Sequence, residues 1–323
     1  MSFDRLQEKI NKLKNPSVVG LDPALSQIPP QIMEKHIAEK GETFEAAADA
    51  VYEFNTGLID ALHDIVPAVK PQSAYYEALG PDGAWALKKT CDYARANGMY
   101  VILDGKRNDI GSTAEAYSAA YLGAVNIGSA KLRPFDVDAL TVNAYLGSDG
   151  IKPFIDLAVK HDKAIFVLVK TSNPSAGELQ DLLAGQGDGS STPTGTGVPS
   201  PCLAFCPVYA IVGDLVEEIS RDTIGKYGYT RAGAVVGATY PGEVRFLRKR
   251  LRNTFFLVPG YGAQGGSAEE AALAFDEKGT GAIINSSRGI IAAWKKSGGD
   301  YRTAARNEAL HMRDDLRKAV YGL

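Results

Sequence analysis

Eight short apolar runs constrain the fold of this chain more than any other feature of its sequence. Each run is rich in Val, Ile, Leu, Phe or Ala and is continuously apolar, as expected of parallel strands buried on both faces. The runs occupy residues 17–21, 68–71, 99–103, 139–143, 164–169, 233–238, 254–258 and 281–285. Helical spacing lies between them, for example at Leu87, Cys91 and Ala94. We therefore predict an α/β fold, a (β/α)8 TIM barrel that forms a single domain over residues 1–323 with loop insertions.

One segment interrupts this alternation. Residues 185–201 (GQGDGSSTPTGTGVPSP) contain almost no apolar side chains. Such a composition cannot bury enough surface to fold alone, so we predict a flexible Gly/Ser/Thr/Pro-rich loop insertion. Two interpretations stay open for it. It is either a solvated insertion or a lid, because lids in barrels grow from the loops that follow strands.

Charge and composition argue against several classes of protein. The formal net charge of −3 leaves no basic footprint for nucleic acid. No run approaches the roughly 20 apolar residues of a membrane span. The first 15 residues carry charges where a signal peptide needs an apolar core, so we expect a cytoplasmic protein. Cys202 and Cys206 have the spacing of half a zinc site, but no second Cys or His pair follows, so we expect no metal.

Candidate functional residues stand directly after the apolar runs, because the active sites of such barrels lie at the C-terminal ends of the strands. The densest group is Asp104, Lys106 and Asp109, three charges within six positions between an apolar run and a Gly-Ser-Thr helix start. Asp104 and Lys106 are two residues apart, so their side chains share one face of an extended strand. Asp109 lies beyond that face unless the chain turns sharply. The other candidates are Asp22, Lys70, Asn143, Thr171, Ser172, Thr239, Gln264, Ser287 and Arg288.

On the residues alone, the three charges also fit a surface loop that makes salt bridges. The sequence around these three charges favours a catalytic site. The run from Asp104 to Thr113, DGKRNDIGST, resembles the D-x-K-x-x-D-I-x-x-T signature of the orotidine 5'-phosphate decarboxylase family. Further segments resemble other parts of that family in the same order along the chain, namely VGLDP at 19–23, VKPQ at 69–72, KTSNP at 170–174, PGYGAQGG at 259–266 and NSSRG at 285–289. The resemblance covers nearly the whole barrel and is closest to the longer bacterial branch of the family.

This resemblance implies a reaction. It is the decarboxylation of orotidine 5'-phosphate to uridine 5'-phosphate (UMP) and carbon dioxide, the last step of de novo pyrimidine biosynthesis, without a cofactor. Lys106 would donate the proton to C6 within an array of Lys70, Asp104, Lys106 and Asp109. The alternating charges of that array would keep Lys106 protonated in a buried site.

The resemblance also implies how the substrate binds. Asp22 would contact the ribose, and Ser172 the pyrimidine. Gln264 and Ser287 with Arg288 would hold the phosphate, where a guanidinium and backbone N–H groups suit an anion. Asp109 and Thr113 would reach the active site of a partner subunit, which implies a homodimer with shared sites.

Three alternatives stay open on the residues alone. A sugar-phosphate decarboxylase or aldolase-like barrel shares the charged skeleton but uses a metal ion. The Ile110-Gly-Ser-Thr113 continuation and Ser172-Asn-Pro favour the nucleotide instead. A non-catalytic phosphate-binding barrel would lack a member of the charged array, yet all four are present. A Schiff-base aldolase would need Lys106 or Lys170 to be neutral, which flanking carboxylates disfavour.

Overall fold

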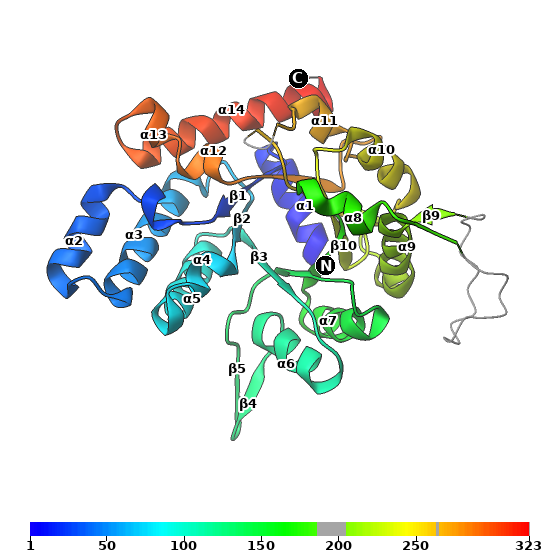
Figure 1. The fold of residues 1–323 in the computed structure, drawn as a ribbon, viewed down its shortest axis with the longest axis horizontal. Helices are drawn as coiled ribbons and strands as arrows, with labels where there is room; N and C mark the ends of the chain where they lie inside the picture. Colours follow the sequence, from blue (N-terminus) through cyan, green and yellow to red (C-terminus); the bar gives the residue numbers. More distant parts are fainter. Residues whose placement is uncertain (186–204, 263–264, 323) are drawn as a thin grey trace.

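The computed structural model describes residues 1–185, 205–262 and 265–322. Its eight parallel strands close into a barrel in the order β1-β12-β11-β10-β7-β6-β3-β2 (Figure 1). These strands are β1 (Ser17–Leu21), β2 (Ala68–Pro71), β3 (Tyr100–Arg107), β6 (Ala139–Val142), β7 (Ala164–Lys170), β10 (Ala232–Val236), β11 (Phe256–Val258) and β12 (Ala282–Ser286). Every run predicted from the sequence coincides with a barrel strand to within a few residues, so the (β/α)8 prediction is confirmed.

Helices surround the barrel and connect its strands. They are α1 (Ser2–Leu13), α2 (Pro30–Lys40), α3 (Phe44–Leu62), α4 (Ser73–Glu77), α5 (Gly80–Ala96), α6 (Gly111–Tyr121), α7 (Ser148–His161), α8 (Gly177–Gln180), α9 (Val208–Ser220), α10 (Pro241–Arg250), α11 (Ala268–Ala272), α12 (Arg288–Ile291), α13 (Trp294–Ser297) and α14 (Tyr301–Tyr321). Two short antiparallel ribbons lie outside the barrel, β4 (Val125–Ile127) with β5 (Ala130–Leu132), and β8 (Leu183–Ala184) with β9 (Cys206–Pro207).

Helix α1 closes the N-terminal end of the barrel. Its Phe3, Leu6 and Ile10 are buried in one cluster with inward side chains of the strands. The Phe3 ring lies 4.9 Å from the ring of Phe166 and 5.0 Å from that of Phe255, measured between centroids. Burial of such aromatic side chains is among the larger stabilising terms that a core offers. With this end filled, the C-terminal ends of the strands form the open end of the barrel.

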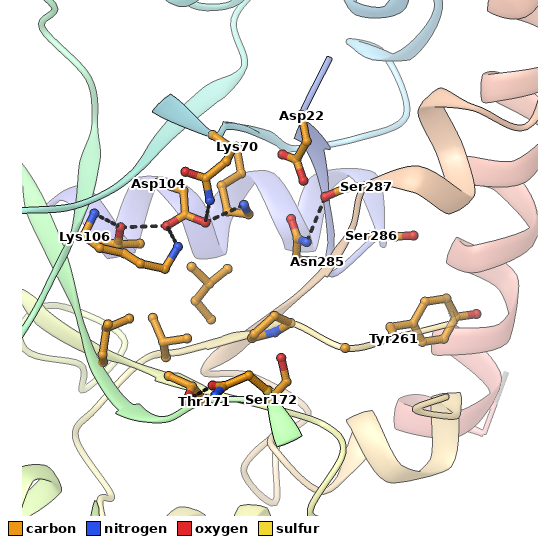
Figure 2. A pocket seen from close by; sticks show the side chains of 18 of the residues that line it. Asp22, Lys70, Asp104, Lys106, Thr171, Ser172, Tyr261, Asn285, Ser286 and Ser287 are labelled. Carbon is orange, nitrogen blue, oxygen red and sulfur yellow. Dashed lines mark hydrogen bonds and ion pairs between the residues drawn. The ribbon is translucent and has the colours of Figure 1, made fainter. Parts of the chain in front are cut away.

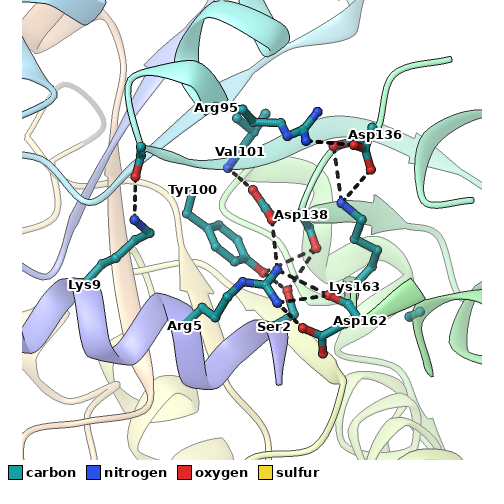
Figure 3. A network of polar contacts seen from close by, with 12 residues as sticks. Ser2, Arg5, Lys9, Arg95, Tyr100, Val101, Asp136, Asp138, Asp162 and Lys163 are labelled. Carbon is teal, nitrogen blue, oxygen red and sulfur yellow. Dashed lines mark hydrogen bonds and ion pairs between the residues drawn. The ribbon is translucent and has the colours of Figure 1, made fainter. Parts of the chain in front are cut away.

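Ion pairs at the closed end join α1 to the strands and their loops (Figure 3). Arg5 forms ion pairs with Asp138, at 3.0 Å, and with Asp162. In the same network Lys163 lies 2.9 Å from Asp136. Charged groups at this end of such barrels serve stability and not chemistry, so we assign these residues a structural role.

Two predictions are limited by what the structure describes. Residues 186–201 of the predicted loop insertion lie outside the described residues, so its flexibility stays a prediction. Within the described residues, no helix has both the length and the apolar character needed to span a lipid bilayer.

Candidate active site

A cavity of about 510 Å³ lies at the open end of the barrel. It collects eight of the residues predicted from the sequence, Asp22, Lys70, Asp104, Lys106, Thr171, Ser172, Ser287 and Arg288. Figure 2 shows Asp104, Lys70 and Lys106 together on one wall, with Thr171 and Ser172 across the cavity from them. Asp22 and Ser287 lie beside each other on a third side. Strand ends that are far apart in the sequence therefore meet around one ligand-sized space.

Asp104 is the centre of the polar contacts on its wall. Its Oδ2 accepts hydrogen bonds from Lys70 Nζ at 2.8 Å and from Gln72 Nε2 at 2.9 Å. Its Oδ1 accepts from Lys106 Nζ at 2.7 Å and from Thr141 Oγ1 at 2.9 Å. One buried carboxylate therefore fixes two ammonium groups from two neighbouring strands.

The charges of this group stabilise one another. Burial of Asp104 disfavours its charged form, but Lys70 and Lys106 outweigh that effect and hold the pKa of Asp104 well below its ordinary value. Burial likewise disfavours the ammonium of Lys70, but Asp104 and then Asp22 raise the pKa of Lys70 above its ordinary value. Asp104 and Lys70 consequently remain charged at neutral pH, and an anionic substrate meets a fixed pattern of charge.

The backbone at Lys106 departs from a regular strand. Lys106 has a φ of 48°, and the pairing of β3 with β6 shifts register between Leu103 and Arg107. The Lys106 N–H donates to Thr141 Oγ1 at 2.9 Å, which holds this left-handed turn in place. Simple alternation along a strand was therefore an incomplete reason for the shared face, because a bulge re-aims the lysine. A left-handed conformation in a non-glycine residue is unfavourable and often occurs at functional sites.

The third side of the cavity combines the end of β1 and the end of β12. Asn285 Nδ2 donates to Ser287 Oγ at 3.3 Å, and Arg288 follows as the first residue of α12. A Cβ atom at Gly20 would lie 1.8 Å from Ser287 Oγ, so only glycine lets this serine approach β1. Asp22 Oδ1 is buried and has no hydrogen-bond partner among the described residues. That oxygen can accept a ligand hydroxyl.

Several predicted site residues lie elsewhere in this chain. The lining given by the described residues contains neither Asp109 nor Thr113. Asp109 Oδ1 accepts the backbone N–H of Ile110 at 2.8 Å, and Thr113 is exposed on α6. Within one chain the charged array therefore has three members and not four. Two weaker candidates, Asn143 and Thr239, are also absent from that lining, and Gln264 lies outside the described residues.

Sequence reasoning did not single out seven polar residues that line the cavity, Gln72, Thr141, Asn173, Gln180, Tyr261, Asn285 and Ser286. Thr141 and Asn285 lie within strands, where a polar residue in an apolar run was the available signal. Gln72 and Gln180 belong to connecting segments and have no such signal. In the described part of the chain, no group of three or more His, Cys, Asp or Glu side chains could hold a metal ion.

The fold is a closed (β/α)8 barrel, and a charged triad, a serine and an arginine surround one cavity at its open end. This arrangement is that of a TIM-barrel enzyme that acts on a small polar substrate. Residues 34–192 match the model of the orotidine 5'-phosphate decarboxylase / HUMPS family. The chain belongs to the orotidine 5'-phosphate decarboxylase family, as its near full-length similarity to proteins of that name also shows.

Three relatives illustrate that similarity. The orotidine 5'-phosphate decarboxylase of Rhodopirellula baltica is 40% identical over 97% of this chain and 98% of the relative. That of Caldicellulosiruptor bescii is 39% identical over 90% of both chains. The solved structure of OMP decarboxylase from Leishmania donovani is 29% identical, with a TM-score of 0.67 over 97% of this chain and 99% of the other. All three relatives align with this chain over at least 90% of their own length.

Proposed function

We propose that this protein decarboxylates orotidine 5'-phosphate to UMP and carbon dioxide, and that Lys106 supplies the proton to C6. The observation that carries the proposal is the clamp of Asp104 between two ammonium groups, at 2.8 Å from Lys70 and 2.7 Å from Lys106. An anionic group and a proton donor held side by side suit a reaction in which one carboxylate leaves and a proton takes its place. Family membership supports the same substrate.

The cavity suggests one orientation for the substrate. Arg288 and Ser287 would bind the phosphate, since a guanidinium matches phosphate oxygens through paired hydrogen bonds. The free Asp22 Oδ1 and the Lys70 ammonium would bind the ribose hydroxyls. The pyrimidine would then lie between Ser172 and the charged wall, with its carboxylate near Asp104.

The chemistry follows from the charges. The bond between C6 and the carboxylate carbon breaks, and its electron pair stays on C6 while carbon dioxide leaves. The Lys106 ammonium stabilises that pair and transfers one proton to C6, after which the neutral lysine regains a proton from water. Repulsion between Asp104 and the substrate carboxylate would be about 4 kcal/mol at ~4 Å and an effective dielectric near 20, and it is relieved as carbon dioxide leaves.

We further propose that the active enzyme is a homodimer in which Asp109 and Thr113 contribute to the partner's site. Support comes from exposed apolar side chains on the segments that follow β3 and β6. Ile127, at the tip of the β4–β5 ribbon, is 63% exposed, and Tyr145, after β6, is 80% exposed. Ile110 and Tyr117 add further exposed apolar side chains near Asp109. A second copy would cover such exposed apolar side chains and bring a fourth charge to each array.

One assay tests the reaction directly. Purified protein is mixed with orotidine 5'-phosphate in the presence of a metal chelator, and the loss of orotate absorbance is followed. We expect rapid turnover to UMP that the chelator does not slow. Absence of turnover would refute the proposal, and turnover that needs added metal would refute the metal-free mechanism.

A further inference from the structure

We infer that Gln180 is a pyrimidine-binding residue, and that an ion pair between the buried Lys170 and the half-exposed Asp181 holds it in place. The inference rests on the proposed function, since it assigns a residue to the base of the same nucleotide. Gln180 is the last residue of α8 and lines the cavity together with Ser172 and Asn173.

The side-chain amide of Gln180 is fixed by Thr171. Its Oε1 accepts the backbone N–H of Thr171 at 2.9 Å, and its Nε2 donates to Thr171 Oγ1 at 2.7 Å. Thr171 Oγ1 in turn donates to Asn173 Oδ1 at 2.6 Å. The amide cannot flip without setting its N–H groups against the N–H of Thr171. Because an amide nitrogen carries two hydrogens, one N–H of Nε2 remains for a ligand.

Lys170 and Asp181 are the residues next to Thr171 and Gln180 in the sequence. Lys170 precedes Thr171, Asp181 follows Gln180, and the two charged side chains form an ion pair. The Lys170 side chain has no exposed surface, and its Nζ lies 4.6 Å from the ring centroid of Tyr240 and 5.3 Å from that of Tyr209. A buried ammonium group is unfavourable unless it is paired with a negative charge. Lys170 therefore keeps Asp181, and with it the adjacent Gln180, in this position.

Tyr240 also contacts the segment that lies between Thr171 and Gln180. Its hydroxyl donates to the backbone oxygen of Asn173 at 3.4 Å. Residues 170–181 thus form a closed loop whose base is fixed by two adjacent contacts, Lys170 with Asp181 and Thr171 with Gln180. Across the cavity from Thr171 and Ser172 stands the charged wall of Asp104 and Lys70 (Figure 2).

The fixed donor selects a particular ligand chemistry. An N–H held at constant direction suits a carbonyl oxygen, and the orotate and uracil rings each carry two ring carbonyl groups. Ser172 offers a hydroxyl next to it in the same lining. Gln180 therefore donates to a ring carbonyl oxygen and contributes to the affinity for the base, whereas it contributes nothing to the phosphate or the ribose.

Two ligands separate this role from a structural one. UMP carries the base, and ribose 5-phosphate lacks it. In Gln180→Ala we expect the dissociation constant for UMP to rise about fivefold, as for loss of one neutral hydrogen bond, while that for ribose 5-phosphate stays the same. Gln180→Glu keeps the acceptor for the Thr171 N–H but has no N–H of its own, so it should weaken UMP at least as much. Calorimetric titration measures both ligands.

Matched variants complete the test. Glu178→Ala changes an exposed side chain on the same helix and should leave both affinities as in the wild type. Asp181→Asn removes the charge that pairs with Lys170, and we expect part of the loss in UMP affinity without a change for ribose 5-phosphate.

Three outcomes decide the matter. Selective loss of UMP affinity in the Gln180 variants supports the assignment. Equal loss for both ligands, or no loss for either, overturns it. If the wild-type protein binds UMP through Gln180 but does not decarboxylate orotidine 5'-phosphate, then the proposed reaction fails and the assignment stands.

Discussion

Replacement of Asp104 by asparagine tests whether carboxylate repulsion contributes to the reaction. The substitution preserves shape and removes one negative charge from between the Lys70 and Lys106 ammonium groups. In the wild type, a substrate carboxylate about 4 Å from Asp104 would be repelled by about 4 kcal/mol at an effective dielectric of 20. In Asp104→Asn that repulsion disappears, and two unneutralised ammonium groups attract the same carboxylate.

The size of the effect follows from that energy. Since about 1.4 kcal/mol is a factor of ten, 4 kcal/mol corresponds to about a thousandfold. We therefore expect orotidine 5'-phosphate to bind up to about a thousandfold more tightly relative to UMP, which has no carboxylate. Turnover should fall by a similar factor or more, because departure of carbon dioxide no longer relieves any repulsion.

The measurement is a ratio of two affinities. Stopped-flow single-turnover kinetics give the dissociation constant of orotidine 5'-phosphate, and calorimetry gives that of UMP. Gln72→Met is the matched control, because it removes a neutral donor to Asp104 Oδ2 and leaves every charge in place. Its affinity ratio should equal that of the wild type. If Asp104→Asn changes both affinities by the same factor, then Asp104 exerts no selective repulsion and the reasoning is wrong.

Four further results are expected. Lys106→Met should lower turnover by at least about 10²-fold, since it removes the proton donor, while calorimetry should find UMP affinity within about tenfold of the wild type. Mixed Lys106→Ala and Asp109→Ala proteins, each inactive, should regain up to about a quarter of wild-type activity after subunit exchange, and no recovery would argue against shared sites. Ile127→Asp should shift the protein to monomer in sedimentation, with loss of activity; an unchanged dimer would exclude this ribbon from the interface. Because folding lowers the pKa of Asp104, its contribution to stability is present above its unfolded pKa near 3.8 and is lost as pH falls through the lower folded value. Urea denaturation should accordingly show a constant difference between wild type and Asp104→Asn from about pH 8 to 5 and a shrinking difference below about pH 4.

The fold was predictable from the sequence because its signal is local. Each barrel strand, such as Ala164–Lys170, is buried on both faces, and its sequence is a nearly continuous apolar run. The helix Phe44–Leu62 begins at Thr43, whose side chain accepts the N–H of Ala46, and its apolar residues recur at helical spacing. Such patterns depend on neighbours within a few residues, so they can be read without the tertiary structure.

The charged triad was predictable for a related reason. Lys70, Asp104 and Lys106 follow apolar runs, and every strand of a parallel barrel ends on the same side. Any polar residue at a strand end is therefore a candidate for the open face. Lys70, Asp104 and Lys106 do line one cavity in the structure.

Only the tertiary structure decided how those residues are arranged. The left-handed turn at Lys106 depends on a hydroxyl from Thr141 on the next strand, 35 residues away in the sequence. Gln180 lines the cavity, and its neighbour Asp181 pairs with Lys170, which is buried against two tyrosines. Asp109 and Thr113 belong to the motif in sequence but lie outside the cavity lining that the described residues form. Contacts between distant segments set these positions, and a pattern of neighbouring residues carries no information about such contacts.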